Sequence, residues 1–437
     1  MAASVDHLRD LPLVPLDRPR WHHSGSKGSQ DPHALVYRDD YPMKSCWRNS
    51  WLIPFLWVAI LFQLPPSGSA QSLQTDLNRQ ELFPPGMAGI ARYRIPGIAV
   101  TKRGTILAYC EARRNGSGDW GEIEVHLRRS IDGGKTWLPS QKIAHRSDRI
   151  EGNPTKPSGG ETEQTVNNPV AIVDRLTGAI EFLYCVNYAR CFKMRSLDEG
   201  ATWSDPEEIT SIFEPFRDSY DWKVIATGPG HGIQISSGRL LVPIWLAYGP
   251  AGAHHPSAAA TIYSDDHGVT WKAGTIAMPD EGDYGDPNES ILASTSDGKV
   301  LMITRNESVS NRKLVAISPD GATQWSRPAF HEELWEPRCM ASLLNHSSGV
   351  LLFSNPRTVG RDASGKELPD SRGKRENLTI QLSRDDGSTW PVRKTLEAGP
   401  SAYSDMAELS DGSLLCLYER NDSIDCARFT LEWIQTP

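Results

Sequence analysis

An eight-residue motif that occurs five times is the feature that most constrains how this chain can fold. Four copies have the form S-x-D-x-G-x-T-W: residues 130–137, 196–203, 264–271 and 383–390. A fifth copy, residues 318–325, keeps Ser, Asp and Trp but has Ala322 and Gln324 in place of Gly and Thr. Successive copies begin 66, 68, 54 and 65 residues apart. Recurrence at a near-constant period indicates a repeat architecture, in which each unit buries its apolar face against its neighbours.

The residue types of the motif are those of a tight turn between two strands. Ser and Asp side chains bond back to the nearby backbone, Gly adopts a positive φ, and Trp anchors the turn between strands. We therefore interpret the aspartates of the motif as structural and not as catalytic.

Motifs of this kind are the Asp-boxes of β-propellers. Residues 85–435 have room for about six four-stranded blades of ~40–60 residues each. Residues 122–129 alternate apolar and polar side chains, which is the pattern of a half-buried strand, and no segment has a long helical period. The sequence predicts an all-β fold, a six-bladed β-propeller with Asp-box repeats. Because unrelated functions share such scaffolds, function has to be argued from a site.

The N-terminal part of the chain has a different composition. Residues 1–42 are polar, rich in Pro, His and charge, and without periodicity, which is not the pattern of a packed domain. Two basic residues then precede a 14-residue apolar run, residues 51–64, and small residues end the stretch at Ala70. This order is typical of a secretory signal peptide.

We therefore expect a leader over residues 1–70, with the signal peptide at about 43–70, followed by a propeller domain over residues 71–437. The protein is then secreted, or periplasmic or extracellular. The apolar run is shorter than the ~20 residues of a membrane span, so we expect no obligatory span, and an uncleaved N-terminal anchor is the alternative. Translation from Met43 would leave residues 1–42 unmade.

Charge and cysteine content exclude some classes of partner. The net charge of −8 and the pI of about 5.9 argue against nucleic acid. The seven cysteines form no C-x-x-C pair, which makes a zinc site unexpected, and we expect neither a metal nor an organic cofactor. Cys46 belongs to the leader. Export permits disulfides among the other six cysteines, and Cys185 with Cys191 and Cys416 with Cys426 have hairpin-like separations, but six cysteines allow fifteen pairings.

Two segments near the start of the domain hold candidate site residues. Arg94 begins a predicted strand near the propeller axis, and Asp119 lies in a Gly-rich loop, where functional groups often stand on a rigid scaffold. A solvated Arg and a turn-capping Asp are the plainer alternatives. Glu122 and Glu124 are competing carboxylates, but they alternate with apolar residues, so we assign them to the solvent face of a strand.

Further candidates stand at predicted strand ends later in the chain: Glu289 in Asn-Glu-Ser, Arg305 in Thr-Arg-Asn, Arg375 in Arg-Glu-Asn, Tyr403 in Gly-Pro-Ser-Ala-Tyr-Ser, and Glu419 in Tyr-Glu-Arg. With Arg94 in Arg-Ile-Pro, the Asp-boxes and residues 228–234, these motifs resemble the exo-sialidase (neuraminidase) family, in the family's order. The resemblance covers nearly all of residues 85–435.

The resemblance implies a binding site for the carboxylate of sialic acid. Arg94, Arg305 and Arg375 correspond to the three arginines that clamp it, and guanidinium suits this task because it is planar, permanently charged and bidentate. Glu419 corresponds to the carboxylate that braces Arg94, and Arg113 to an arginine that reaches a ring hydroxyl. Arg372 and Lys374 stand close enough to Arg375 to leave its register open.

The resemblance also implies the reacting groups. Asp119 corresponds to the acid/base, Tyr403 to the nucleophile and Glu289 to the base that takes the Tyr403 proton. A neutral phenol avoids placing one anion against the carboxylate of the substrate.

The function implied is hydrolysis of terminal α-linked sialic acids from glycans, glycoproteins or glycolipids, with retention of configuration through a tyrosyl-enzyme intermediate. A sialic-acid-binding propeller without turnover is one alternative, although a lectin has no need of Asp119, Glu289 and Tyr403 together. A hydrolase of a related 2-keto acid sugar is the other, because the same arginines would serve it.

Overall fold

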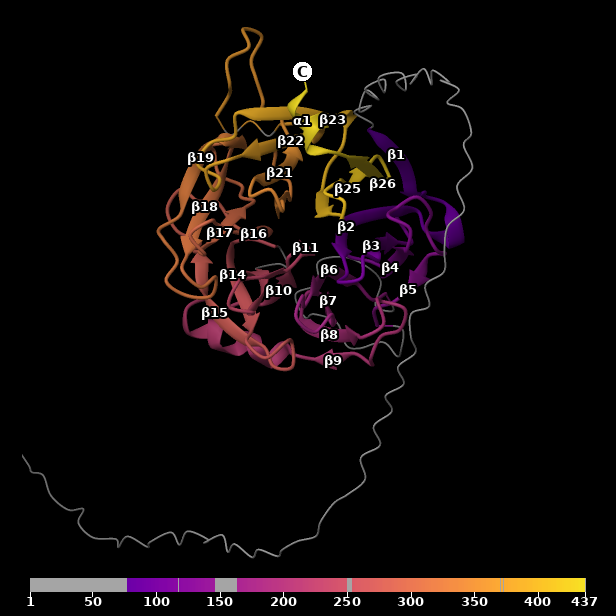
Figure 1. Ribbon diagram of the computed structural model, residues 1–437. Coiled ribbons are helices and arrows are strands. Elements are labelled where there is room, and N and C mark those ends of the chain that lie inside the picture. Colours follow the sequence, from indigo (N-terminus) through magenta and orange to yellow (C-terminus); the bar gives the residue numbers. More distant parts are fainter. Residues whose placement is uncertain are drawn as a thin grey trace, which may run out of the picture. The chain divides into compact units, whose positions relative to one another are not determined.

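Six mostly antiparallel sheets surround a common axis in the computed structural model of the protein (Figure 1). The structure describes residues 77–116, 118–145, 163–249, 254–369, 371 and 373–436. The expected leader, residues 1–70, and Arg372 lie outside the described residues. The predicted fold class, an all-β six-bladed propeller, is confirmed.

Blades I to III follow one another along the chain, and the first strand of each lies toward the centre of Figure 1. Blade I consists of β2 (Arg92–Val100), β3 (Ile106–Arg113), β4 (Ile123–Ser130) and β5 (Gln141–Lys142). Blade II consists of β6 (Val166–Val173), β7 (Ile180–Val186), β8 (Arg190–Ser196) and β9 (Glu207–Glu208), with β11 (Gly230–His231) parallel to β6. Blade III consists of β10 (Val224–Thr227), β13 (Leu240–Ala247), β14 (Ser257–Ser264) and β15 (Lys272–Met278), with β12 (Ile233–Gln234) beside β13.

Blades IV to VI complete the ring. Blade IV consists of β16 (Ser290–Ser294), β17 (Val300–Thr304), β18 (Arg312–Ser318) and β19 (Ala329–Trp335). Blade V consists of β20 (Ser342–Asn345), β21 (Leu351–Pro356), β22 (Glu376–Ser383) and β23 (Val392–Pro400). Blade VI consists of β24 (Ser404–Glu408), β25 (Leu414–Arg420), β26 (Ser423–Phe429) and β1 (Asn78–Phe83). The helices among the described residues are short: η1 (Met87–Gly89), η2 (Thr210–Asp218) and α1 (Leu431–Gln435).

Blade VI explains why six blades carry five Asp-boxes. Each box joins the third and fourth strands of one of blades I to V. In blade VI the fourth strand is β1, which comes from the other end of the domain and pairs antiparallel with β26, with Asn78 opposite Arg428. No turn joins these two strands, so blade VI has no place for a box.

The boxes form the turns that the sequence predicts. In the first box, the Ser130 hydroxyl accepts a hydrogen bond from the Gly134 amide (2.9 Å) and donates one to Asp132 (2.8 Å). Asp132 also accepts from the amide (2.9 Å) and the hydroxyl (2.6 Å) of Thr136, and Gly134 has φ of 82°. The Asp132 carboxylate thus forms its hydrogen bonds within the turn, which confirms its structural role.

The divergent box, residues 318–325, is the fourth along the chain. It makes the same turn with a shift of one residue. The Gly321 amide bonds to Ser318 (2.9 Å) with φ of 72°, and the amide of Thr323 bonds to Asp320 (2.7 Å). Gly and Thr are therefore present in this box, one position earlier than in the others.

The solvent-face assignment of Glu124 is wrong. Glu124 is only 5% exposed and forms ion pairs with Arg114 (2.8 Å) and Lys142 (3.1 Å). Glu122 is half-buried and accepts a hydrogen bond from the Gln164 amide (3.2 Å) at the start of blade II. Neighbouring blades cover both faces of a blade. Alternation of apolar and polar residues along its strands therefore distinguishes apolar positions from ion-paired positions, and not buried positions from exposed ones.

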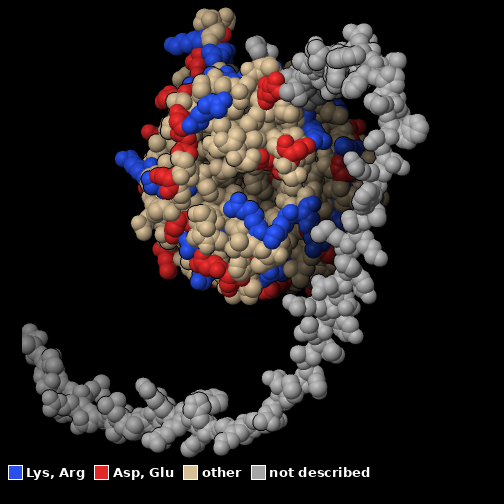
Figure 2. Space-filling model, viewed as in Figure 1, with Lys and Arg blue, Asp and Glu red and all other residues tan. Residues whose placement is uncertain are grey.

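The six cysteines of the described residues are buried free thiols. Cys185 and Cys191 stand opposite each other on β7 and β8, and the pair is not joined. Within the described residues, no helix is both long and apolar enough to cross a membrane. Figure 2 shows a hollow near the centre of one face, with Lys and Arg side chains gathered beside it and charges of both signs spread over the remainder.

Candidate active site

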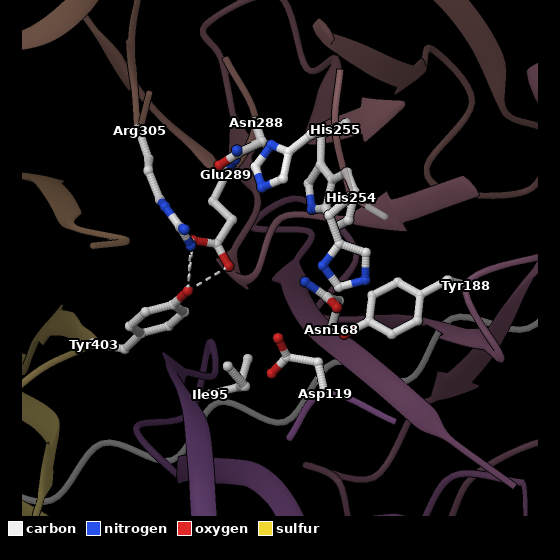
Figure 3. A pocket seen from close by; sticks show the side chains of 11 residues that line it. Ile95, Asp119, Asn168, Tyr188, His254, His255, Asn288, Glu289, Arg305 and Tyr403 are labelled. Carbon is white, nitrogen blue, oxygen red and sulfur yellow. Dashed lines mark hydrogen bonds and ion pairs between the residues drawn. The ribbon is translucent and has the colours of Figure 1, made fainter. Parts of the chain in front are cut away.

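The predicted site residues converge at one edge of the propeller, because the first strand of each blade begins there and the second strand ends there. Glu289 and Tyr403 directly precede the first strands β16 and β24, and Arg305 directly follows the second strand β17. They line a pocket together with Asn288 and with residues from other blades (Figure 3): Ile95, Asp119, Asn168, Tyr188, Trp245, His254 and His255.

Tyr403, Glu289 and Arg305 form a closed hydrogen-bonded group on one side of the pocket (Figure 3). The Tyr403 hydroxyl lies 2.7 Å from each carboxylate oxygen of Glu289, to which it donates. Nη1 of Arg305 donates both to the Tyr403 oxygen (2.7 Å) and to Glu289 (2.7 Å). Burial raises the pKa of Tyr403 far above its ordinary value; Arg305 opposes this shift and Glu289 adds to it. The phenol is therefore neutral, with a carboxylate in place to receive its proton.

A strained backbone aims Arg94 into the site. Ile95 has φ of 57°, which is a genuine outlier for a β-branched residue, and β2 is bulged between Arg94 and Gly97. Glu419 compensates, since it accepts from the Ile95 amide (2.9 Å) and from Nε (3.1 Å) and Nη2 (3.3 Å) of Arg94. The predicted bracing of Arg94 by Glu419 is thus present. Strain held in place by the surrounding structure is characteristic of functional sites.

Two further arginines approach the same tyrosine. The guanidinium carbon atoms of Arg94 and Arg375 lie 5.0 and 5.2 Å from the centroid of the Tyr403 ring, within the range of cation–π attraction. Nη2 of Arg375 donates to the carbonyl of Arg338. The predicted trio of Arg94, Arg305 and Arg375 therefore surrounds one phenol, and an acidic protein concentrates positive charge at this point.

Asp119 lies across the pocket from Tyr403 (Figure 3), with 46% of its side chain exposed. Nη1 of Arg113 lies 3.1 Å from its Oδ1, and Nη1 of Arg94 lies 3.7 Å away. Burial by itself raises the pKa of Asp119, but the charges of Arg113 and Arg94 outweigh it and hold the pKa below its ordinary range. Asp119 is therefore held as an anion by these two arginines.

Arg113 stands behind Asp119, and its own side chain is only 1% exposed. Its Nε and Nη2 donate to Glu111 (3.1 and 2.7 Å), while Nη1 donates to the carbonyl of Gly118 (2.8 Å) as well as to Asp119. Glu111, which is fully buried, also accepts from the Asn168 amide (2.9 Å). The structure thus gives Arg113 a direct role in orienting Asp119.

Several pocket residues were missed by the sequence analysis, and they share an aromatic or amide side chain. Tyr188 and His254 have ring centroids 4.5 Å apart, and Trp245 lies 5.1 Å from His254, which gives the pocket one aromatic wall. Burial lowers the pKa of His254 to about 4, so this imidazole is neutral at neutral pH. The sequence contained no signal for this wall, because its members come from three separate loops and strands.

The chain is similar to known proteins over most of its length. A family model for the BNR repeat-like domain matches residues 104–416. A sialidase of Micromonospora viridifaciens is 31% identical over 401 residues, which cover 85% of this chain and 56% of that protein. A sialidase of Bacteroides fragilis (strain YCH46) is 28% identical over 361 residues, 75% of this chain and 60% of that protein. The chain thus spans just over half the length of these two relatives.

A solved structure shows the same similarity. The Hadza microbial sialidase Hz136 superposes with a TM-score of 0.65 at 27% identity, covering 81% of this chain and 68% of that one.

Proposed function

The chain belongs to the sialidase family with BNR repeats, and from this premise we propose that it is an exo-α-sialidase. The reaction is hydrolysis of terminal α-linked sialic acids with retention of configuration, through a tyrosyl-enzyme intermediate. One observation carries the proposal: the neutral Tyr403 hydroxyl lies 2.7 Å from both oxygens of Glu289 inside a ring of three arginines.

The arginines account for substrate recognition. Sialic acid has a carboxylate on its anomeric carbon, so a reagent that attacks this carbon must approach beside an anion. Arg94, Arg305 and Arg375 surround Tyr403, and hydrogen bonds from guanidinium to a carboxylate are among the strongest that proteins form. The substrate carboxylate bound there is held within reach of the phenol oxygen.

The first chemical step joins Tyr403 to the sugar. The phenol oxygen attacks the anomeric carbon while Glu289 takes its proton, and the bond to the leaving oxygen breaks as Asp119 protonates that oxygen. In the second step water attacks the same carbon, Asp119 takes a proton from the water, and Glu289 returns its proton to the departing Tyr403 oxygen. Two inversions at one carbon give net retention.

The low pKa of Asp119 beside Arg113 and Arg94 requires that substrate binding raise it for this scheme to operate. A general acid must be protonated when the leaving group departs. A substrate carboxylate that pairs with Arg94 neutralises one of the charges that lower the pKa of Asp119, and it adds an anion nearby. Binding therefore raises the pKa of Asp119 toward the range in which it can donate.

The proposal extends to the substrates and the location of the protein. Sialylated glycans, glycoproteins or glycolipids supply the terminal sugar. Basic residues, an apolar run and small residues at 43–70 support secretion. N-terminal sequencing of the mature protein tests this point, with a start shortly after Ala70 expected and a start at Met1 or Met43 contradicting it.

The decisive experiment is incubation with a fluorogenic α-sialoside, with NMR to identify the anomer released first. We expect turnover with the α-anomer appearing first. Binding of the sugar without turnover would indicate a lectin, and a β-anomer appearing first would contradict the tyrosyl intermediate. The same assay on the deaminated analogue shows whether a related 2-keto acid sugar is the better substrate.

A further inference from the structure

We propose that Arg338 is a positioning residue that sets the spacing of two of the clamp arginines, Arg305 and Arg375. Arg338 lies in the segment between β19 of blade IV and β20 of blade V. Arg305 belongs to blade IV and Arg375 to blade V, so Arg338 stands where the chain crosses from one to the other. The inference rests on the proposed function, because the clamp is useful only if it binds a carboxylate.

The side chain of Arg338 acts on Arg305 through a shared carboxylate. Nε of Arg338 lies 3.0 Å from Oε2 of Glu307, and Nη2 of Arg305 lies 2.9 Å from Oε1 of the same group. Nη2 of Arg338 also donates to the Glu307 backbone carbonyl (3.3 Å). Arg338 therefore holds Oε2 of Glu307, and the other carboxylate oxygen, Oε1, orients the guanidinium of Arg305.

The backbone of Arg338 acts on Arg375. The carbonyl oxygen of Arg338 accepts a hydrogen bond from Nη2 of Arg375. Arg338 has φ of 58°, a left-handed conformation that is uncommon for a residue with a long side chain. This conformation lets one residue direct its side chain toward Glu307 and its carbonyl toward Arg375.

A buried ion pair holds the segment in this conformation. Lys313 and Glu336, each with a side chain 1% exposed, are 2.8 Å apart. Glu336 accepts from the amides of Cys339 (3.0 Å) and Asn306 (3.2 Å), so it ties the residue after Arg338 to the residue after Arg305. Several contacts around Arg338 thus hold its backbone in the strained conformation, as expected where strain serves a function.

Positioning matters here because hydrogen bonds between guanidinium and carboxylate depend on direction. Two guanidiniums that bind one carboxylate repel each other when the site is empty, and each needs a fixed partner to remain in place. Glu307 supplies that partner for Arg305, and the Arg338 carbonyl supplies it for Arg375. Loss of the Arg338 side chain should displace Arg305, and a shift of the Arg338 backbone should displace both Arg305 and Arg375.

Three variants separate these effects. Arg338→Asn removes the guanidinium, but Asn tolerates positive φ and so keeps the carbonyl in place. Arg338→Val disfavours positive φ and moves the carbonyl. Glu307→Gln keeps the shape and removes the charge between the two arginines. The control is Arg239→Asn, which removes an arginine that pairs with Asp265 and Asp320 in two Asp-box turns.

Crystal structures of the unliganded variants give the direct readout. We expect the Arg305 guanidinium to be displaced or in several conformations in Arg338→Asn and Glu307→Gln, with Arg375 unchanged, and both arginines displaced in Arg338→Val. Arg305 and Arg375 staying in place in all three variants overturns the inference, whatever the protein does to sugars.

Calorimetric binding of 2,3-didehydro-2-deoxy-N-acetylneuraminic acid gives the functional readout. We expect affinity to fall on the order of tenfold in Arg338→Asn and Glu307→Gln, the loss of about one good hydrogen-bonded contact, and further in Arg338→Val. KM should rise by a similar factor, while the melting temperatures of Arg338→Asn and Glu307→Gln match that of Arg239→Asn. Wild-type affinity in all three variants overturns the inference. Absence of binding and turnover by the wild type instead contradicts the proposed function, and the arginine positions in the crystals then still decide the inference.

Discussion

The Tyr403 hydroxyl lies 2.7 Å from both carboxylate oxygens of Glu289, so the proton can pass to either oxygen without movement of the side chains. An unperturbed phenol has a pKa near ~10 and is a poor nucleophile at neutral pH unless a base takes its proton during attack. Because burial raises the pKa of Tyr403 further, its reactivity depends on this contact.

Tyr403→Phe should abolish the normal retaining route and leave the melting temperature nearly unchanged, because it removes only one buried hydroxyl. A 3-fluorosialyl reagent should label Tyr403 in the wild type, as read by peptide mass mapping. Tyr418→Phe is the matched control, since the Tyr418 hydroxyl also donates to a glutamate, Glu397, at 2.9 Å. Near-normal turnover with retention in Tyr403→Phe, or a label on another residue, contradicts the assignment.

Asp119→Ala should slow cleavage of natural sialosides more than cleavage of an activated aryl sialoside. General acid catalysis is typically worth 10²–10⁴-fold, and poor leaving groups need it most. The ratio of kcat/KM on the two substrates is the measurement. Glu122→Gln alters a nearby carboxylate that accepts a hydrogen bond from the Gln164 amide, and it should not change this ratio. Equal losses on both substrates in Asp119→Ala would mark a structural residue.

Arg305→Ala should weaken binding of the substrate carboxylate by about 2–5 kcal/mol, the range for truncating one partner of a buried hydrogen-bonded charge pair. Arg305→Lys should also impair binding, because a lysine cannot form two parallel hydrogen bonds. Steady-state kinetics and inhibitor affinity check both variants. Arg190→Lys alters an arginine that bonds to Glu208 with two nitrogens at the outer part of blade II, and it should leave activity unchanged. Unaltered KM and kcat in both Arg305 variants exclude Arg305 from the site.

Glu181 should make stability depend on pH. Burial raises the pKa of this carboxyl from 4.5 to about 7, although Arg195 and Lys193 oppose the shift. Between these values the folded protein holds a proton that the unfolded chain has released, so the free energy of unfolding falls as pH rises through this window. Glu181→Gln cannot ionise, and its free energy of unfolding should exceed that of the wild type by roughly 3 kcal/mol at pH 8.

Thermal unfolding at pH 5 and pH 8 checks this prediction. The advantage of Glu181→Gln over the wild type should be larger at pH 8 than at pH 5. Glu214→Gln, which alters a carboxylate 55% exposed, should show no such change. A gap between wild type and Glu181→Gln that is the same at both pH values shows that Glu181 does not titrate in this window.

The fold could be predicted because its main signal is local. An Asp-box closes its own turn with its own Ser, Asp and Gly, so its sequence is readable without tertiary context. The site residues could be predicted for a related reason: most stand at or near the end of a strand, Asp119 stands in a loop between two strands, and strand ends of successive blades meet at one edge. Glu289 and Tyr403 are 114 residues apart in sequence yet bonded.

What could not be predicted depends on packing between blades. Glu124 followed a surface pattern, but it is buried and paired with Arg114 and Lys142. Tyr188, Trp245 and His254 are ordinary aromatic residues until three segments bring them together. Arg338 belongs to no recognisable motif. The positioning role proposed for it arises from a backbone conformation that a single sequence does not reveal.

The pairing of β1 with β26 has a consequence for how the chain can be processed. The ring has one seam, and the strand that closes it begins at Asn78, only a few residues after the expected end of the leader at Ala70. A protease that cuts within residues 71–77 removes everything before the seam and leaves every blade whole. A cut beyond Phe83 would detach the edge strand, open the ring and expose the unpaired backbone of β26 to other chains. The cut expected on secretion and a cut that opens the ring are therefore separated by a single strand, β1.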